Sequence, residues 1–262
     1  MTPEPSVSFE VAGDAYDRFM GRWSRQLSMP FADFAGVETG QRVVDVGCGT
    51  GALTEELLRR VDPVDVAAVD PSASFVSGIR SRLPAIEVQQ ASAERLPFAD
   101  AVFDVALAQL VVHLMAEPVA GLAEMARVVR PGGTVAACVW DFAGGRGPLG
   151  VFWEAAHSIG VEVHDESSLP GTQDGDLVTL LEMAGLRDVE RSEVSATIEQ
   201  PTFEAWWEPF TLGVGPAGAF VASLSKDERE RLRAACEARL TARPIVVETV
   251  AWAARGRVPG PS

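Results

Sequence analysis

Three glycines at alternate positions follow directly on a short apolar segment. The segment Val43-Val44-Asp45-Val46 leads into Gly47, Gly49 and Gly51. Glycine tolerates positive φ and lets a ligand approach the backbone, and a helix beginning just after the loop presents unpaired N–H groups. The pattern predicts a nucleotide-type ligand at the carboxyl end of a parallel strand. A tight strand–helix turn without a ligand would use the same glycines.

A carboxylate with the spacing of a ribose ligand lies further along the chain. Asp70 ends the apolar segment Val66-Ala67-Ala68-Val69 and follows Gly51 by 19 residues. In dinucleotide-binding folds a carboxylate about 20 residues on binds the ribose hydroxyls. Asp70 can also cap the next helix, with Pro71 at its first position. We favour ribose binding.

The position of Asp45 distinguishes between nucleotide ligands. It lies two residues before the first glycine, and the glycines are spaced Gly-x-Gly-x-Gly. A buried carboxylate would repel a pyrophosphate at this position but attract an ammonium or sulfonium group. The charge pattern therefore favours a cationic nucleoside over NAD or FAD. S-adenosylmethionine (SAM) fits this description.

Four motifs together resemble the class I SAM-dependent methyltransferases, and most closely their bacterial small-molecule branch that includes the quinone-biosynthesis methyltransferases. They lie in order within Gln41–Trp140. The motifs are Asp45-Val-Gly-Cys-Gly-Thr-Gly51, Asp70, Ala91-Ser-Ala-Glu-Arg-Leu-Pro-Phe98 followed by Phe103-Asp104, and Arg127-Val-Val-Arg-Pro-Gly-Gly133. The resemblance implies an α/β, Rossmann-like, doubly wound sheet of seven strands in the order 3-2-1-4-5-7-6. Its last strand would be antiparallel, and helical lid inserts would be added to it.

The resemblance also implies which residues hold the cofactor. Asp45 would bind the methionine ammonium, Asp70 the ribose hydroxyls, and Gln109 would lie near the methyl group. The methionine and ribose would be faced by Gly47, Gly49 and Gly51. The adenine would be bordered by Pro71, Ser92, Ala93 and Glu94. An N-terminal lid would contribute Tyr16, Arg22 and Trp23. In the lid, Arg22 would pair with the ligand carboxylate, and Tyr16 or Trp23 would cover the sulfonium.

Methyl transfer from a sulfonium depends mainly on positioning and on excluding water. A base is needed only where the nucleophile must lose a proton, and His113, four residues after Gln109, is the candidate. A structural contact near a helix start is the alternative for His113; His157 and His164 are weaker candidates for the base. The aromatic residues Phe203, Trp206, Trp207 and Phe210 are expected either to wall an apolar substrate pocket or to form the buried face of an amphipathic helix.

The elements that position these residues alternate between strands and helices. Strands are expected at Arg42–Val46, Val64–Asp70, Ile86–Ala91, Phe103–Gln109 and Thr134–Trp140, with helices between them, as in βαβ units. Val189–Ile198 and Ile245–Ala254 are expected to be strands six and seven. We expect a single domain over 1–262, with an N-terminal helical lid over 1–40 and a cofactor-binding core over 41–140. Helices and strand six follow over 141–200, a helical substrate cap over 201–243, and the final strand and tail over 244–262.

Composition narrows the partners further. The net charge of −15 disfavours nucleic acid as a partner. Three distant cysteines without a CxxC pair argue against disulfides and a cysteine-built zinc site, and no metal is expected. No apolar stretch is long enough to span a membrane, and the N-terminus lacks signal-peptide features. We therefore expect a cytoplasmic monomer or homodimer acting on a small molecule, with S-adenosylhomocysteine (SAH) as the cofactor product.

Two other functions are consistent with parts of the pattern. A nicotinamide-dependent oxidoreductase would use a similar glycine loop, but the glycine spacing, Asp45 and the lack of a Tyr-x-x-x-Lys pair disfavour it. A non-catalytic SAM-binding protein would keep the same cofactor motifs. The predicted function is transfer of a methyl group from SAM to an O, N or C atom of a small, partly apolar or aromatic molecule.

Overall fold

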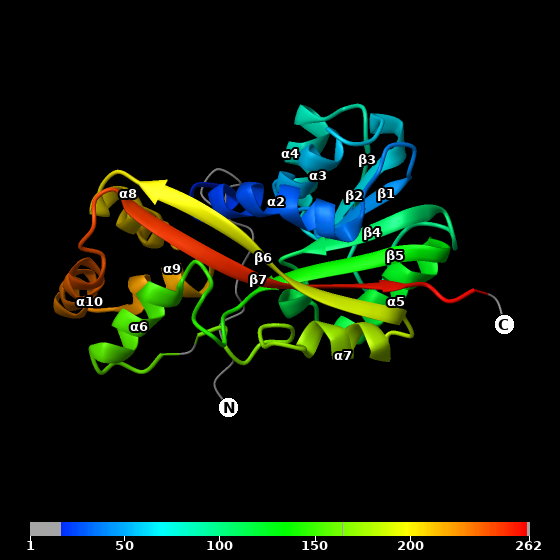
Figure 1. The fold of residues 1–262 in the computed structure, drawn as a ribbon. Helices are drawn as coiled ribbons and strands as arrows, with labels where there is room; N and C mark the ends of the chain where they lie inside the picture. Colours follow the sequence, from blue (N-terminus) through cyan, green and yellow to red (C-terminus); the bar gives the residue numbers. More distant parts are fainter. Residues whose placement is uncertain (1–16, 164, 261–262) are drawn as a thin grey trace.

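A mixed β-sheet organises the computed structural model, which describes residues 17–163 and 165–260 (Figure 1). Within these residues the sheet has seven strands in the order β3-β2-β1-β4-β5-β7-β6. Strands β1 to β5 are parallel, and β7 runs antiparallel to both β5 and β6. This confirms the predicted fold and strand order. The strands are β1 (Val43–Val46), β2 (Val66–Asp70), β3 (Glu87–Gln90), β4 (Phe103–Gln109), β5 (Val129–Trp140), β6 (Arg187–Gln200) and β7 (Ile245–Arg257).

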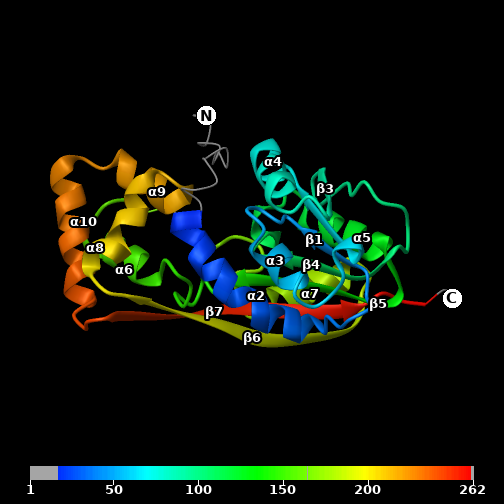
Figure 2. The same cartoon turned by 90° about the horizontal axis from the view of Figure 1, so that it is seen from above.

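Helices cover both faces of the sheet, which makes three layers (Figure 2). On one face, apolar residues of α2, α3 and α4 pack against the strands, and on the other face those of α5 and α7 do so. Because β1 and β2 are covered on both sides, every residue in them is buried, which explains their unbroken apolar character. These helices are α2 (Arg22–Ala35), α3 (Ala52–Leu57), α4 (Ala73–Arg82), α5 (Pro118–Val128) and α7 (Asp176–Met183).

A helical cap is carried at one end of the sheet. The β6–β7 ladder continues from Ser195 to Gln200 and from Ile245 to Val250, beyond the part of β7 that pairs with β5. The cap lies at the end of this ribbon (Figure 1) and has its own apolar core. Its helices are α6 (Gly150–Ser158), α8 (Phe203–Trp207), η4 (Glu208–Leu212), α9 (Gly215–Ser223) and α10 (Lys226–Arg239).

The start of β5 differs from the prediction. Strand five was expected to begin at Thr134, after a turn at Pro131-Gly132-Gly133, but it begins at Val129. The backbone N–H of Gly132 donates to Val258 O, and that of Val258 donates to Gly133 O. These bonds hold the Pro-Gly-Gly segment within the sheet. The other predicted strands and helices are present, with ends shifted by a few residues.

The N-terminal segment forms part of the core as well as a connection to the cap. A short π-helix, η1 (Asp17–Gly21), leads into α2. Leu27 and Phe31 of α2 are fully buried against the sheet. Arg18 of η1 pairs with Glu208 of the cap at 2.5 Å. The segment therefore joins the sheet to the cap.

Candidate active site

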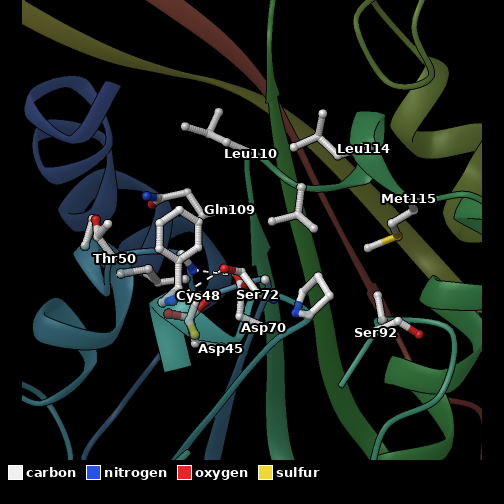
Figure 3. A pocket seen from close by; sticks show the side chains of 18 of the residues that line it. Asp45, Cys48, Thr50, Asp70, Ser72, Ser92, Gln109, Leu110, Leu114 and Met115 are labelled. Atoms are coloured by element: carbon white, nitrogen blue, oxygen red, sulfur yellow. Dashed lines mark hydrogen bonds between the residues drawn. The ribbon is translucent and has the colours of Figure 1, made fainter. Parts of the chain in front are cut away.

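A cavity of about 350 Å³ lies at the carboxyl ends of β1, β2 and β4. Its polar residues Asp45, Asp70 and Ser72 lie on one side, and the apolar side chains of Leu110 and Leu114 lie on the other (Figure 3). Strand β1 lies between β2 and β4, so the connections leave the sheet in opposite directions at this point. Such a switch point is where parallel α/β sheets bind ligands.

The glycine loop reaches the cavity because its backbone adopts positive φ. Gly47 has φ 74° and Gly49 has φ 53°. A Cβ on Gly47 would lie 2.5 Å from Val111 Cγ2, so only glycine lets the loop pass beneath this neighbour. Both glycines line the cavity. Gly51 does not line it and instead precedes the first residue of α3, with φ 91°.

The carboxylate of Asp70 is held in a fixed orientation at the end of β2. The backbone N–H of Gly49 donates to Asp70 Oδ2 at 2.8 Å, and that of Ser72 donates to Oδ1 at 2.8 Å. Burial raises the pKa of Asp70 above its ordinary value, while these two bonds oppose the shift. A carboxylate offers about four acceptor positions, so roughly two are left for hydroxyl groups of a ligand. The arrangement fits the paired hydroxyls of a ribose.

Asp45 is a carboxyl that lacks a counter-ion among the residues described around it. It is 1% exposed, and Thr54 Oγ1 donates to its Oδ2 at 2.6 Å. Burial raises the pKa of Asp45 to about 7; the Thr54 hydrogen bond opposes the rise and the charge of Asp70 adds to it. A cation placed here would favour the ionised carboxylate. The site thus fits an ammonium group.

Gln109, at the end of β4, lines the same cavity and has a buried acceptor oxygen. Its Nε2 donates to Ser24 O and to Ser28 Oγ, both at 3.1 Å, and Ser28 Oγ in turn donates to Ser24 O at 2.7 Å. Since a carbonyl oxygen can only accept, Nε2 must face α2 and Oε1 must face away. Oε1 is buried and has no hydrogen-bond partner among the described residues. An unpaired buried acceptor costs about 1–3 kcal/mol, so a ligand donor would be favoured here.

Four more of the predicted cofactor residues lie at the cavity. Pro71, Ser92, Ala93 and Glu94 all line the cavity. Glu94 Oε1 accepts hydrogen bonds from the backbone N–H groups of Ala116, at 3.0 Å, and Glu117. This connection holds two loops of the cavity wall together.

Two of the predicted lid residues, Arg22 and Trp23, do not line the cavity. Arg22 Nη1 lies 3.5 Å from Ala205 O of the cap, and Trp23, also of α2, is buried in the core. Tyr16 lies outside the described residues, as does His164. Burial lowers the pKa of Arg22.

His113 lies next to the cavity but is not part of its lining. Its ring packs edge-on against Phe142, with the centroids 5.8 Å apart, and Nδ1 is buried without a partner among the described residues. Burial lowers the pKa of His113 to about 4. The imidazole is therefore neutral at pH 7. The four aromatic residues of α8 and η4 are also absent from the lining, because Phe203, Trp206, Trp207 and Phe210 form part of the cap's core.

Several cavity residues have no counterpart in the sequence analysis. Ser24 lines the cavity and Ser28 fixes Gln109, while Phe75, Leu114 and Met115 supply apolar walls. The sequence contains one indication that the two serines matter, since both lie on the apolar face of α2, among Trp23, Leu27 and Phe31. A buried polar residue on such a face needs a partner.

The charge of the cavity excludes one class of ligand. Asp45, Asp70 and Glu94 line it, and no Lys or Arg does so within the part of the chain that the structure describes. A pyrophosphate would therefore meet carboxylates without a compensating cation. Between residues 17 and 260, with 164 set aside, no cluster of His, Cys, Asp and Glu is suited to a metal ion. The same residues include no helix of the length and apolarity that crossing a membrane requires.

Comparisons with known proteins show which family this chain resembles. Residues 44–137 match the model of a methyltransferase domain family. The demethylmenaquinone methyltransferase of Beutenbergia cavernae is 35% identical over 125 residues, which cover 48% of this chain and 50% of that protein. The ubiquinone/menaquinone biosynthesis C-methyltransferase UbiE of Cupriavidus metallidurans is 30% identical over 183 residues, covering 63% of this chain and 74% of the relative.

A solved structure extends the likeness to nearly the whole chain. The SAM-dependent methyltransferase of Thermotoga maritima has a TM-score of 0.56 at 18% identity and covers 94% of this chain and 95% of its own. At this identity the likeness shows the fold. The match to the Beutenbergia protein spans only about half of its length. With the family match and the UbiE relative, the motifs and the fold establish that this chain belongs to the class I SAM-dependent methyltransferases.

Proposed function

We propose that this protein transfers the methyl group of SAM, by in-line displacement, to an O, N or C atom of a small, partly apolar or aromatic molecule. The observation that carries the proposal is the acidic cavity, in which Asp45 and Asp70 are positioned without a basic neighbour among the described lining residues. Such a site suits a cationic nucleoside. The bound cofactor supplies an electrophilic methyl group on a sulfonium.

The residues of the cavity would divide the binding of the cofactor between them. Asp70 would accept hydrogen bonds from the ribose hydroxyls, and Asp45 would hold the methionine ammonium. Gln109 Oε1, fixed by the serines of α2, would accept a further hydrogen bond beside the methionine portion. Pro71 and the Ser92–Glu94 segment would border the adenine.

The protein's contribution to the chemistry would be positioning and exclusion of water. The apolar side chains of Leu110, Leu114 and Met115 face the polar side of the cavity (Figure 3). A dry and preorganised cavity favours displacement at a sulfonium, since the charge there is dispersed as the reaction proceeds. His113 is neutral at pH 7 and would serve as a base only for an acceptor that must lose a proton.

Calorimetric titration with SAM, SAH and NAD tests the proposal. Wild type should bind the first two and not NAD, and Asp70→Ala should lose this binding. Asp62→Ala, which removes an exposed carboxyl, is the control. Transfer of labelled methyl from SAM to a panel of phenols, amines and quinones then tests turnover. Binding of NAD alone would indicate an oxidoreductase, and binding of SAM without transfer to any acceptor would indicate a non-catalytic binding protein.

A further inference from the structure

A second cavity, of about 280 Å³, lies between the β5–α6 connection, α6 and the segment that precedes α7. Acidic and aromatic side chains dominate its wall, and within the described residues no Lys or Arg lines it. The principal lining side chains are Phe142, Trp153, Glu154, His157, Asp165 and Glu166. The wall therefore combines negative charge with aromatic rings, which is the combination that binds organic ammonium groups.

Glu166 is the buried acid of this cavity. Its side chain is among the buried charged groups, at 6% exposure, and its Oε2 accepts a hydrogen bond from Trp153 Nε1 at 2.7 Å. Burial raises the pKa of Glu166 to about 7, and the charge of Asp165 adds to the rise. A buried carboxyl of this kind gains more from a nearby cation than an exposed one does, because water no longer solvates it.

Among the residues that the structure describes, no cation pairs with Glu166. Asp165 Oδ2 lies 3.7 Å from His157 Nε2, and His157 Nδ1 is bonded to Trp153 O at 2.7 Å. Arg239 reaches Glu154 of the cavity wall at 3.9 Å, and this glutamate side chain is 72% exposed. That ion pair lies at the solvent side and does not reach the buried acid.

Two aromatic rings separate this cavity from the first one. Val111 and Leu114 line the first cavity, and His113, which lies between them in the chain, packs on Phe142 of the second.

We propose that the second cavity binds the ammonium group of a small aromatic amine, with Glu166 as its counter-ion and Trp153 and Phe142 as its aromatic walls. Because two aromatic rings separate this cavity from the first one, the site is distinct from the cofactor cavity, and the proposal does not depend on the methyl-transfer function. It adds a ligand class that the cofactor site does not specify.

The test is calorimetric titration of 2-phenylethylamine, and of 2-phenylethanol as its uncharged analogue, at pH 8 with and without SAH. Wild type should bind the amine at least tenfold more tightly than the alcohol. Glu166→Gln should remove most of this preference, because the amide keeps the acceptor for Trp153 but has no charge. Glu154→Gln, which alters the exposed acid of the same wall, should keep it. SAH affinity, measured on each variant, reports whether the protein is folded.

Each result bears on one of the two proposals. Equal affinity for amine and alcohol, or an amine preference that survives Glu166→Gln, would overturn the ammonium site while leaving methyl transfer intact. An amine preference without methyl transfer to any tested acceptor would support the site and count against the proposed function.

Discussion

Replacing Asp45 by Asn is expected to make the protein more stable and less able to bind its cofactor. The carboxyl of Asp45 is 1% exposed and has a pKa of about 7 in place of the ordinary 3.8. A raised pKa means that the folded protein binds this proton more tightly than the unfolded chain does. The ionised form is therefore destabilising, and the penalty grows as the pH rises through the interval between the two values.

The size of the effect follows from the shift. Each pKa unit corresponds to about 1.4 kcal/mol, and a shift of about three units gives about 4 kcal/mol above pH 7. Asparagine has no such penalty and its side-chain oxygen can still accept from Thr54 Oγ1, although its NH₂ group adds an unpaired donor worth about 1 kcal/mol at every pH. The advantage of Asp45→Asn should hence be absent near pH 4 and reach about 3 kcal/mol at pH 8.

Urea unfolding of wild type and Asp45→Asn at pH 4.5, 5.5, 6.5 and 8 measures this difference. Asp62→Asn, which replaces an exposed carboxyl, is the control. At pH 8 the more stable variant should bind SAH at least tenfold more weakly, since a charged hydrogen bond is worth about 1.5–3 kcal/mol. A stability difference that does not vary with pH would refute the reasoning, because Asp45 would then titrate as an ordinary exposed carboxyl.

Three further predictions concern the same cavity. In wild type, SAH affinity should fall about tenfold from pH 8 to pH 6 as Asp45 takes up a proton, and a flat calorimetric profile would contradict its pairing with an ammonium. Gly47→Ala should lower stability by about 1–2 kcal/mol more than Gly49→Ala in thermal unfolding, because only the first adds a clash to the cost of positive φ; equal losses would count against the close approach at position 47. Ser28→Ala should weaken SAH binding several-fold, because it removes the hydroxyl that accepts from Gln109 Nε2. Ser24→Ala should not, because Gln109 Nε2 donates to the backbone oxygen of Ser24. Equal effects of the two substitutions would show that the hydrogen bond to Ser28 Oγ does not matter.

The sheet and the cofactor motifs were predictable because their information is local. Buried parallel strands are continuous apolar runs, so β1, β2 and β4 stand out in the sequence. The spacing from Gly51 to Asp70 spans one helix and one strand, which fixes where the carboxylate lies relative to the glycine loop. Asp45, Gly47, Gly49 and Asp70 accordingly all lie at one cavity.

The parts that were missed depend on contacts between distant segments. Gln109 is fixed by Ser24 and Ser28, more than 80 residues earlier in the chain, and no spacing rule links them. The aromatic residues of the cap gave an ambiguous pattern, since a helix face that lines a substrate cavity and one that fills a core have the same period. The structure shows that Trp206 and Phe210 belong to the cap's core.

Three buried oxygen-bearing groups link stability to binding in this molecule. Asp45 and Glu166 are carboxyls whose pKa is raised to about 7 by burial, and Gln109 presents a buried oxygen without a partner among the described residues. Burial of each group lowers the stability of the unliganded protein. When a ligand cation or hydrogen-bond donor pairs with the group, this lost stability is recovered as binding free energy. All three line cavities in whose described lining there is no Lys or Arg. A protein selected for stability alone would replace these groups by apolar ones, and their joint presence is best explained by ligands of positive charge.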